Sequence, residues 1–305
     1  MEVKTVLKKN SKSSGFDLGD IALSIKKDLE RDIEKTDSNK ISKKNKDKEE
    51  DKRYVLTGIT GFDKLFKNGI PRGNNIIILG GPGSGKTIFC LQTLAYHAAQ
   101  GKKCLYMSFE ESEERLIDHM KEFGWNPEAL IKSGNLKINR YLTTDIYYEE
   151  DSSSAGVQAM MAKSSDNLLL DLEPFVIGDE GYKPDIVVID SLTAVSSTFI
   201  GKDRSYRFYV ERLFRFFEKI GTTNFLITEP PHTSDDHTQS GTEEFLSDGV
   251  IVIYNAKRGN VRESGIEVLK MRGEKHEKKI VAMQITDNGI VVHPDQEIFG
   301  DIEKF

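Results

Sequence analysis

The chain has 305 residues, of which 37% are hydrophobic and 30% charged, and its formal net charge is −6. This length suits one large α/β domain with tails, or two small domains. The negative charge disfavours a dedicated nucleic-acid-binding protein, whose domains are usually strongly basic. No apolar run reaches the roughly 18–20 residues of a membrane span, and no signal peptide is evident, so we expect a cytoplasmic protein. Cys90 and Cys104 lie in apolar segments and are expected to be buried, reduced thiols.

Residues 1–53 form a charged N-terminal tail that we predict to be disordered, because it has too few apolar residues to offset the entropy of ordering. Within this tail, apolar residues recur every four positions and form one stripe, at Ile21, Ile25, Leu29 and Ile33. The stripe predicts either a transient helix or a helix that docks on a partner protein or a neighbouring subunit.

From residue 54 onward, short apolar strands alternate with helices. We predict strands at 75–79, 103–109, 185–190 and 223–228, and helices at 87–100, 112–123 and 206–220. Further strand-like runs follow at 250–254, 266–271, 280–285 and 290–292. This order predicts an α/β fold, with a mostly parallel sheet between helices and antiparallel hairpins extending one side. Residues 143–184 have no clean period and are expected to form a surface excursion with one helix.

Residues 80–87 match the full P-loop pattern, directly after an apolar strand and before a helix. The glycines let the backbone wrap around phosphate, and the helix N-terminus offers it donors and a favourable dipole. Lys86 is expected to reach the β- and γ-phosphates, and the Thr87 hydroxyl to ligate Mg²⁺. The predicted nucleotide-binding residues are Gly81, Pro82, Gly83, Ser84, Gly85, Lys86, Thr87 and Ile88.

Two further strands end in carboxylates at the edge where parallel sheets bind ligands. Asp190 follows four apolar residues, and we expect it to hold Mg²⁺ beside Thr87, through water. Glu110 and Glu111 end another strand, and hydrolysis needs a base that polarises the attacking water. Glu110 is the first candidate and Glu111 the second. The alternative is an acidic helix start in solvent, which the helix dipole favours.

Together these motifs resemble the core of the RecA-type ATPases of the KaiC-like branch. The resemblance covers roughly residues 54–293. Its segments outside the P-loop are 60–63, 69–73, 108–112, 123–125, 189–191, 228–229, 244–249, 269–276 and 285–290. The last of these is the most specific for the branch. The resemblance implies a single RecA-like P-loop domain over residues 54–305, with ATP and Mg²⁺ as cofactors.

The resemblance also implies roles that the spacing of residues does not. Glu110 and Glu111 match paired catalytic glutamates, and Glu229 matches the position that senses the γ-phosphate. Lys270 and Arg272 match residues that reach a neighbouring subunit's γ-phosphate, which implies a homo-oligomer, plausibly a hexamer. From the residues alone, these two cations would instead be same-face charges on an edge strand.

One departure concerns Glu244 and Phe245, which stand where the second core of the tandem clock members carries phosphorylated Ser and Thr. Autophosphorylation is therefore not expected at these positions. The absence of a second core also means that clock function does not follow from the resemblance.

A His/Asp cluster and three arginines each have a functional interpretation and a solvent-exposed one. His232, Asp235, Asp236 and His237 are interpreted as a solvated loop rather than a metal site. The helix at 206–220 has three arginines, which are interpreted as a solvated face of the helix. The alternative is a stripe that contacts a protein partner or a nucleic acid. These residues are Arg207, Arg212 and Arg215.

We expect a Mg²⁺-dependent ATPase that acts in an oligomer and has a regulatory or signalling role. One alternative is an ATP-dependent DNA-binding module of the recombinase-paralogue or repair type, which net acidity disfavours. The other is an ATP-sensing scaffold with little turnover, whose N-terminal tail recruits a protein partner.

Overall fold

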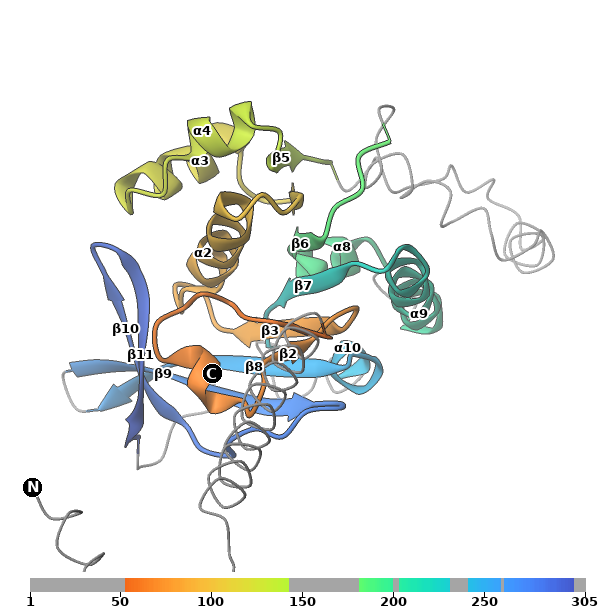
Figure 1. Ribbon diagram of the computed structural model, residues 1–305. Coiled ribbons are helices and arrows are strands. Elements are labelled where there is room, and N and C mark those ends of the chain that lie inside the picture. The colour runs from red at the N-terminus through yellow and green to blue at the C-terminus, as the bar shows by residue number, and fades with distance from the viewer. Residues whose placement is uncertain (1–52, 143–180, 200–202, 231–240, 259–260, 299–305) are drawn as a thin grey trace, which may run out of the picture. The chain divides into compact units, whose positions relative to one another are not determined.

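The computed structural model describes residues 53–142, 181–199, 203–230, 241–258 and 261–298 (Figure 1). They belong to the compact unit Arg53–Phe305. The predicted tail, the loop with His232 and His237, and most of the predicted excursion at 143–184 lie outside the described residues. No helix among the described residues is long and apolar enough to cross a membrane.

A nine-stranded sheet forms the centre of the described fold, in the order β11-β10-β9-β8-β3-β7-β6-β4-β5. All neighbours from β8 to β5 are parallel, whereas β8, β9, β10 and β11 pair antiparallel. The strands are β3 (Asn75–Gly80), β4 (Cys104–Ser108), β5 (Leu136–Arg140), β6 (Ile186–Asp190), β7 (Thr223–Thr228), β8 (Gly249–Arg258), β9 (Val261–Met271), β10 (Val281–Thr286) and β11 (Gly289–Glu297). The predicted parallel sheet with an antiparallel extension is confirmed.

Helices cover both faces of the parallel strands (Figure 1). On one face lie α2 (Lys86–Ala99), α3 (Glu113–Glu122) and α4 (Pro127–Lys132); on the other lie α8 (Leu192–Ser196) and α9 (Asp203–Ile220). The shorter elements are α10 (Thr242–Leu246), the 3-10 turns η1 (Phe62–Leu65) and η3 (Ser197–Phe199), and a separate two-stranded sheet of β1 (Tyr54–Val55) and β2 (Ile70–Pro71).

Two hydrophobic cores follow from the alternation of side chains along each buried strand. Ile76 and Ile78 join the core beneath α2, where the Phe89 ring lies 5.2 Å from that of Phe62. Ile77 faces the opposite way and joins the core beneath α9, which contributes residues such as Leu213. Because both faces of β3 are buried, its sequence is continuously apolar over 76–79 rather than alternating.

The strands and helices expected between residues 75 and 123 and between 185 and 292 all occur, and their ends shift by a few residues. The strand β5 was not predicted, although Leu136 and Ile138 alternate with polar residues and both are buried. It pairs with β4 at the sheet edge. The helix α4 was also missed, despite its N-cap Asn126 and Pro127 in the first turn, because it has only six residues. Cys90 and Cys104 are buried free thiols, as expected.

The hairpin of β10 and β11 returns to the helix that follows the P-loop. The Gln92 side chain of α2 accepts a hydrogen bond from Ile290 N (2.7 Å) and donates one to Ile290 O (3.2 Å). Trp125 Nε1 donates to Asn288 O at 3.3 Å. The antiparallel extension is therefore anchored directly to α2.

Gly289→Ala should destabilise the protein more than the same substitution at a glycine that has a similar positive φ but no close neighbours. Gly289 has φ +112°, and a Cβ there would lie 2.5 Å from Gln92 Oε1. Gly101 has φ +81° with nothing within 4 Å of its Cβ position, so Gly101→Ala is the matched control. We expect Gly101→Ala to lower the free energy of unfolding by about 1 kcal/mol, and Gly289→Ala by about 1–3 kcal/mol more. Urea unfolding measures both, and equal losses would contradict the close packing.

Candidate functional site

The carboxyl ends of four parallel strands meet at one edge of the sheet. Ser108 at the end of β4 pairs with Asp190 at the end of β6, and Leu79 of β3 pairs with Thr228 of β7. The P-loop leaves β3 at this same edge. The register thus brings together residues that lie more than a hundred positions apart in the sequence, as Thr87 and Asp190 do.

The P-loop connects β3 to α2 through residues 81–85. Gly85 is the N-cap of α2 with φ 102°, and no side chain caps the helix there. A Cβ at Gly85 would lie 3.2 Å from Cδ1 of Ile285, which belongs to the β10–β11 hairpin. The first turn of a helix has N–H groups without intrahelical partners, and these together with the helix dipole favour an anion. The loop has the features of a phosphate site.

Lys86 begins α2 and turns its ammonium group back across the loop. Its Nζ donates to the carbonyls of Gly80 (2.7 Å) and Gly81 (2.9 Å) and lies 3.1 Å from Glu229 Oε1. The Lys86 side chain is only 8% exposed, and a buried ammonium group needs such partners. Glu229, which follows β7, is held in turn by a hydrogen bond from its N–H to Thr193 Oγ1 (2.9 Å).

Asp190 is a buried carboxylate beside the start of α2. It is 3% exposed, and its Oδ2 accepts hydrogen bonds from Thr87 Oγ1 (3.1 Å) and Tyr106 OH (2.5 Å). Burial raises the pKa of Asp190 to about 6; the hydrogen bond from Tyr106 opposes this shift, and the charge of Glu110 adds to it. A nearby cation would favour the ionised form of this carboxylate.

Oxygen donors of this kind fit Mg²⁺. In phosphate-binding sites Mg²⁺ is commonly held by one or two carboxylates together with the phosphates, rather than by a complete protein cage. No group of three or more His, Cys, Asp or Glu that could hold a metal ion by itself occurs in the described ranges. Thr87 and Asp190 lie together as the sequence predicted, and they supply a hydroxyl and a carboxylate.

The two candidate glutamates diverge after β4. Ser191 Oγ donates a hydrogen bond to Glu110 Oε1, which ties Glu110 to the residue after Asp190. Glu111 Oε2 instead lies 3.9 Å from Nδ1 of His119 in α3. The turn itself is fixed by Ser108, whose Oγ accepts from Glu111 N at 3.0 Å. The geometry therefore separates the pair and brings Glu110 to the Asp190 strand end.

Lys270 and Arg272 are not brought to this edge. Lys270 pairs with Val250 and Met271 with Gly249, at the start of β8, and Arg272 O accepts from Asn74 Nδ2 at 3.4 Å. Since β8 is parallel to β3, both cations lie at the amino end of the sheet, opposite their own P-loop. β9 lies between β8 and β10, but β10 pairs only with its residues 264–266, so at Lys270 the strand is bonded to β8 alone.

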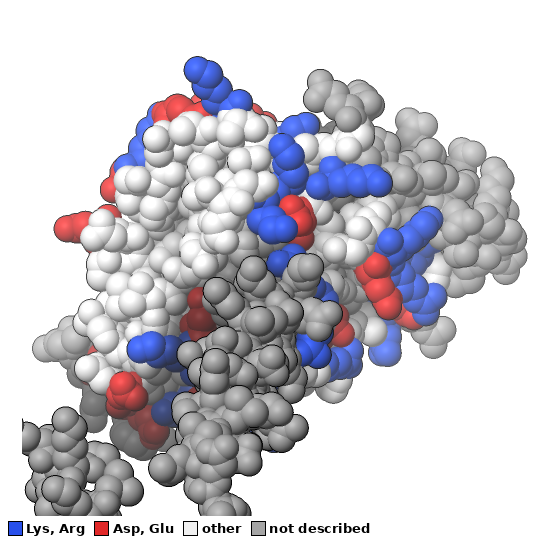
Figure 2. All heavy atoms as spheres, in the orientation of Figure 1, with Lys and Arg blue, Asp and Glu red and all other residues white. Residues whose placement is uncertain are grey.

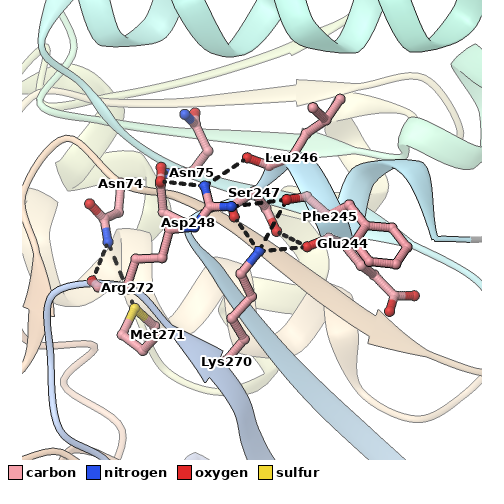
Figure 3. Close-up of polar contacts among 10 residues, drawn as sticks. All are labelled: Asn74, Asn75, Glu244, Phe245, Leu246, Ser247, Asp248, Lys270, Met271 and Arg272. Atoms are coloured by element: carbon pink, nitrogen blue, oxygen red, sulfur yellow. Dashed lines mark hydrogen bonds and ion pairs between the residues drawn. The ribbon is translucent and has the colours of Figure 1, made fainter.

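Both cations are held by the end of α10 (Figure 3). Lys270 Nζ donates to the carbonyls of Glu244 (2.8 Å), Phe245 (3.3 Å) and Ser247 (2.7 Å). Arg272 donates to the carbonyls of Phe245 and Leu246 and to Asp248 Oδ1, at 3.1–3.4 Å. Cations at a helix C-terminus satisfy carbonyls that have no intrahelical partner. The side chain of Phe245 is 79% exposed beside them.

Sequence reasoning missed several residues that complete the site. Tyr106 and Ser191 hold the two carboxylates, and Thr193 holds Glu229. Ser191 could have been found as the polar residue next to Asp190. Tyr106 could not, because in sequence it is one more apolar position of a buried strand.

The arginines of α9 do not form a basic stripe on the described surface. Arg212 is only 7% exposed, so the prediction of a solvated face is wrong for this residue. Arg215 forms an ion pair with Glu211 at 2.6 Å. Figure 2 shows basic and acidic side chains next to each other over α9, where a nucleic-acid-binding surface would be uniformly basic.

The family profile described as "ATPase: KaiC" matches residues 55–297. The circadian clock oscillator protein KaiC of Acaryochloris marina is 30% identical over 254 residues, which are 83% of this chain and 46% of that protein. The chain thus spans about half the length of the clock proteins it matches. A UPF0273 protein of Aeropyrum pernix is 30% identical over 244 residues, covering 80% of this chain and 95% of the relative.

A similar solved structure supports the same assignment. The crystal structure of a KaiC-like protein from the hyperthermophilic archaeon Pyrococcus horikoshii has a TM-score of 0.63 and 28% identity, covering 79% of this chain and 99% of that one. The profile match extends over most of the chain and includes every residue of the site described above. The chain therefore belongs to the KaiC family of ATPases.

Proposed function

We propose that this chain binds ATP with Mg²⁺ at the P-loop and hydrolyses it as part of a homo-oligomer. The observation that carries the proposal is the convergence of Lys86, Thr87, Asp190 and Glu110 at one sheet edge, with the Thr87 hydroxyl bound to the Asp190 carboxylate. Membership of an ATPase family supports nucleotide-triphosphate binding at this place.

Phosphate binding would use the P-loop amides and Lys86. The ammonium group of Lys86 already faces the loop, where it contacts two carbonyls and Glu229. Phosphate oxygens are stronger partners for an ammonium group than carbonyls. A triphosphate would therefore draw Lys86 away from Glu229, which makes Glu229 a residue that responds to the terminal phosphate.

Mg²⁺ would be held by the Thr87 hydroxyl and, through water, by Asp190, together with the phosphates. When bound, it neutralises charge that develops on the transferred phosphoryl group. The Thr87 hydroxyl has one proton, which it donates to Asp190, so its lone pairs remain for the metal ion.

Glu110 would orient and polarise the attacking water. It is exposed at the end of β4, and the hydrogen bond from Ser191 fixes its carboxylate beside the Asp190 strand end. A positioned base of this kind contributes typically 10²–10⁴-fold to the rate. Glu111 has the weaker claim, because its carboxylate lies toward His119.

Glu110→Gln should retain ATP binding and lower the turnover rate at least about 100-fold, because an amide cannot accept the proton of the attacking water. Glu111→Gln is the matched control and should reduce turnover far less. Lys86→Ala should lose nucleotide binding. Phosphate release and fluorescent-nucleotide titration measure the two properties separately. Normal turnover by Glu110→Gln would contradict the assigned base.

The position of Lys270 and Arg272 supports a site completed by a neighbouring copy. The six residues of β3 separate these cations from the P-loop of their own chain, a distance of about 17 Å. They are too far to touch a phosphate at their own P-loop. A head-to-tail contact, which repeats around a closed ring, would bring them to the next subunit's phosphate. A hexamer is one such assembly.

Arg272→Ala should bind ATP normally and lose roughly 1000-fold in turnover, as expected when a transition-state arginine is removed. A mixture with Lys86→Ala, which keeps Arg272 but binds no nucleotide, should regain activity. In a random 1:1 assembly about a quarter of the interfaces pair an intact P-loop with an intact arginine.

The control is Arg272→Ala mixed with the double variant Lys86→Ala/Arg272→Ala, which should regain nothing. Activity is measured after the variants are mixed without nucleotide and then assembled with ATP. No recovery in the first mixture would argue against a site shared between subunits, provided that size-exclusion chromatography shows mixed assemblies.

A further inference from the structure

The hydroxyl of Tyr106 is a buried polar group at the carboxylate that would hold the metal. Tyr106 is the third residue of β4 and is 0% exposed, with its ring in the core beneath α2. Its hydroxyl donates to Asp190 Oδ2 at 2.5 Å. It joins the core of the protein to the phosphate edge of the sheet.

The packing around the ring does not require this hydroxyl. In the sheet, Tyr106 pairs with Val188 on one side and Ile138 on the other, and both are buried apolar residues of the same core. A phenylalanine would fill this layer with no polar group to satisfy. A buried tyrosine hydroxyl needs a partner, and here the partner is a carboxylate at the site rather than a carbonyl of the core.

The hydroxyl also determines which carboxylate oxygen is available. Asp190 Oδ2 accepts from both Tyr106 and Thr87, at 2.5 and 3.1 Å. A carboxylate oxygen has two lone-pair positions, so these donors occupy both. Within the part of the chain that the structure describes, no hydrogen bond to Asp190 Oδ1 occurs alongside them. Oδ1 is thus the oxygen that can accept from a metal-bound water.

We propose that Tyr106 is a positioning residue of the metal site, which holds the Asp190 carboxylate so that Oδ1 faces the ion; the inference rests on the proposed function. The carboxylate is clamped from two sides, by β4 through Tyr106 and by α2 through Thr87. Thr87 lies in the first turn of α2, beside the P-loop, and in the proposed function its hydroxyl also binds the metal ion, whereas Tyr106 is fixed in the core. Tyr106 therefore keeps the orientation of Asp190 independent of the nucleotide.

Tyr106→Phe tests this role with Mn²⁺ as the probe. Binding of Mn²⁺ to the full chain with saturating ADP is followed by electron paramagnetic resonance. Loss of a partner that orients a metal ligand typically weakens metal affinity 10–100-fold, and we expect a loss of at least about 10-fold. Affinity for ADP in the presence of EDTA and the thermal midpoint without metal should stay close to those of the unchanged protein.

Tyr206→Phe is the matched control. Tyr206 is also buried, 2% exposed, and its hydroxyl donates to a carboxylate, that of Glu243 in α10. This variant removes the same kind of hydrogen bond away from the phosphate edge, so its Mn²⁺ affinity should be unchanged. Equal Mn²⁺ affinity in Tyr106→Phe and the unchanged protein, or equal losses in both variants, would overturn the inference.

Asp190→Asn separates this inference from the function on which it rests. If Asp190→Asn loses Mn²⁺ while Tyr106→Phe keeps it, the metal site stands and only the positioning role is wrong. If Asp190→Asn also keeps full Mn²⁺ affinity, Asp190 does not hold the metal, and both the site assignment and the role of Tyr106 fall.

Discussion

A carboxylate buried at the end of a parallel strand must be satisfied by donors or by a cation, and Asp190 imposes this constraint on its surroundings. At 3% exposure it receives two hydroxyl donors, one from a neighbouring strand and one from the helix after the P-loop. The residue beside it holds Glu110. The groups proposed to hold metal and water are therefore placed relative to a single carboxylate. Lys86, proposed to hold phosphate, has a separate set of contacts with two loop carbonyls and Glu229.

Much of this edge could be predicted because its signals are local. The P-loop, the apolar strand before Asp190 and the glutamates after β4 are each contiguous in sequence. The contacts of Tyr106 and Ser191 depend on β4 lying next to β6, a pairing between segments separated by an excursion without clean periodicity. Sequence periodicity shows that a strand is buried, but not which strand lies beside it, so hydrogen bonds between strands remained hidden.

The surroundings of Lys270 and Arg272 were hidden for another reason. Family resemblance proposed a role for both cations but gave no position within their own subunit. The structure places them against the carbonyls that end α10. This helix has only five residues, too few to show a helical period in the sequence. In this arrangement the three N–H groups of Lys270 have three acceptors, whereas the guanidinium of Arg272 retains donors beyond those it uses.

Strand β3 connects the P-loop of a subunit with the region of Lys270 and Arg272, which are proposed to serve the site of the next subunit. Its last residue leads into the P-loop, and its first, Asn75, exchanges hydrogen bonds with Asp248, which also binds Arg272. A short buried strand bonded on both sides is among the least extensible elements of a protein. In a ring of such subunits, the length of β3 would set the distance within each subunit between its own bound phosphate and its Arg272, which would serve the site of the next subunit. A one-residue insertion in β3 would then misalign every site around the ring, although each P-loop kept its own sequence.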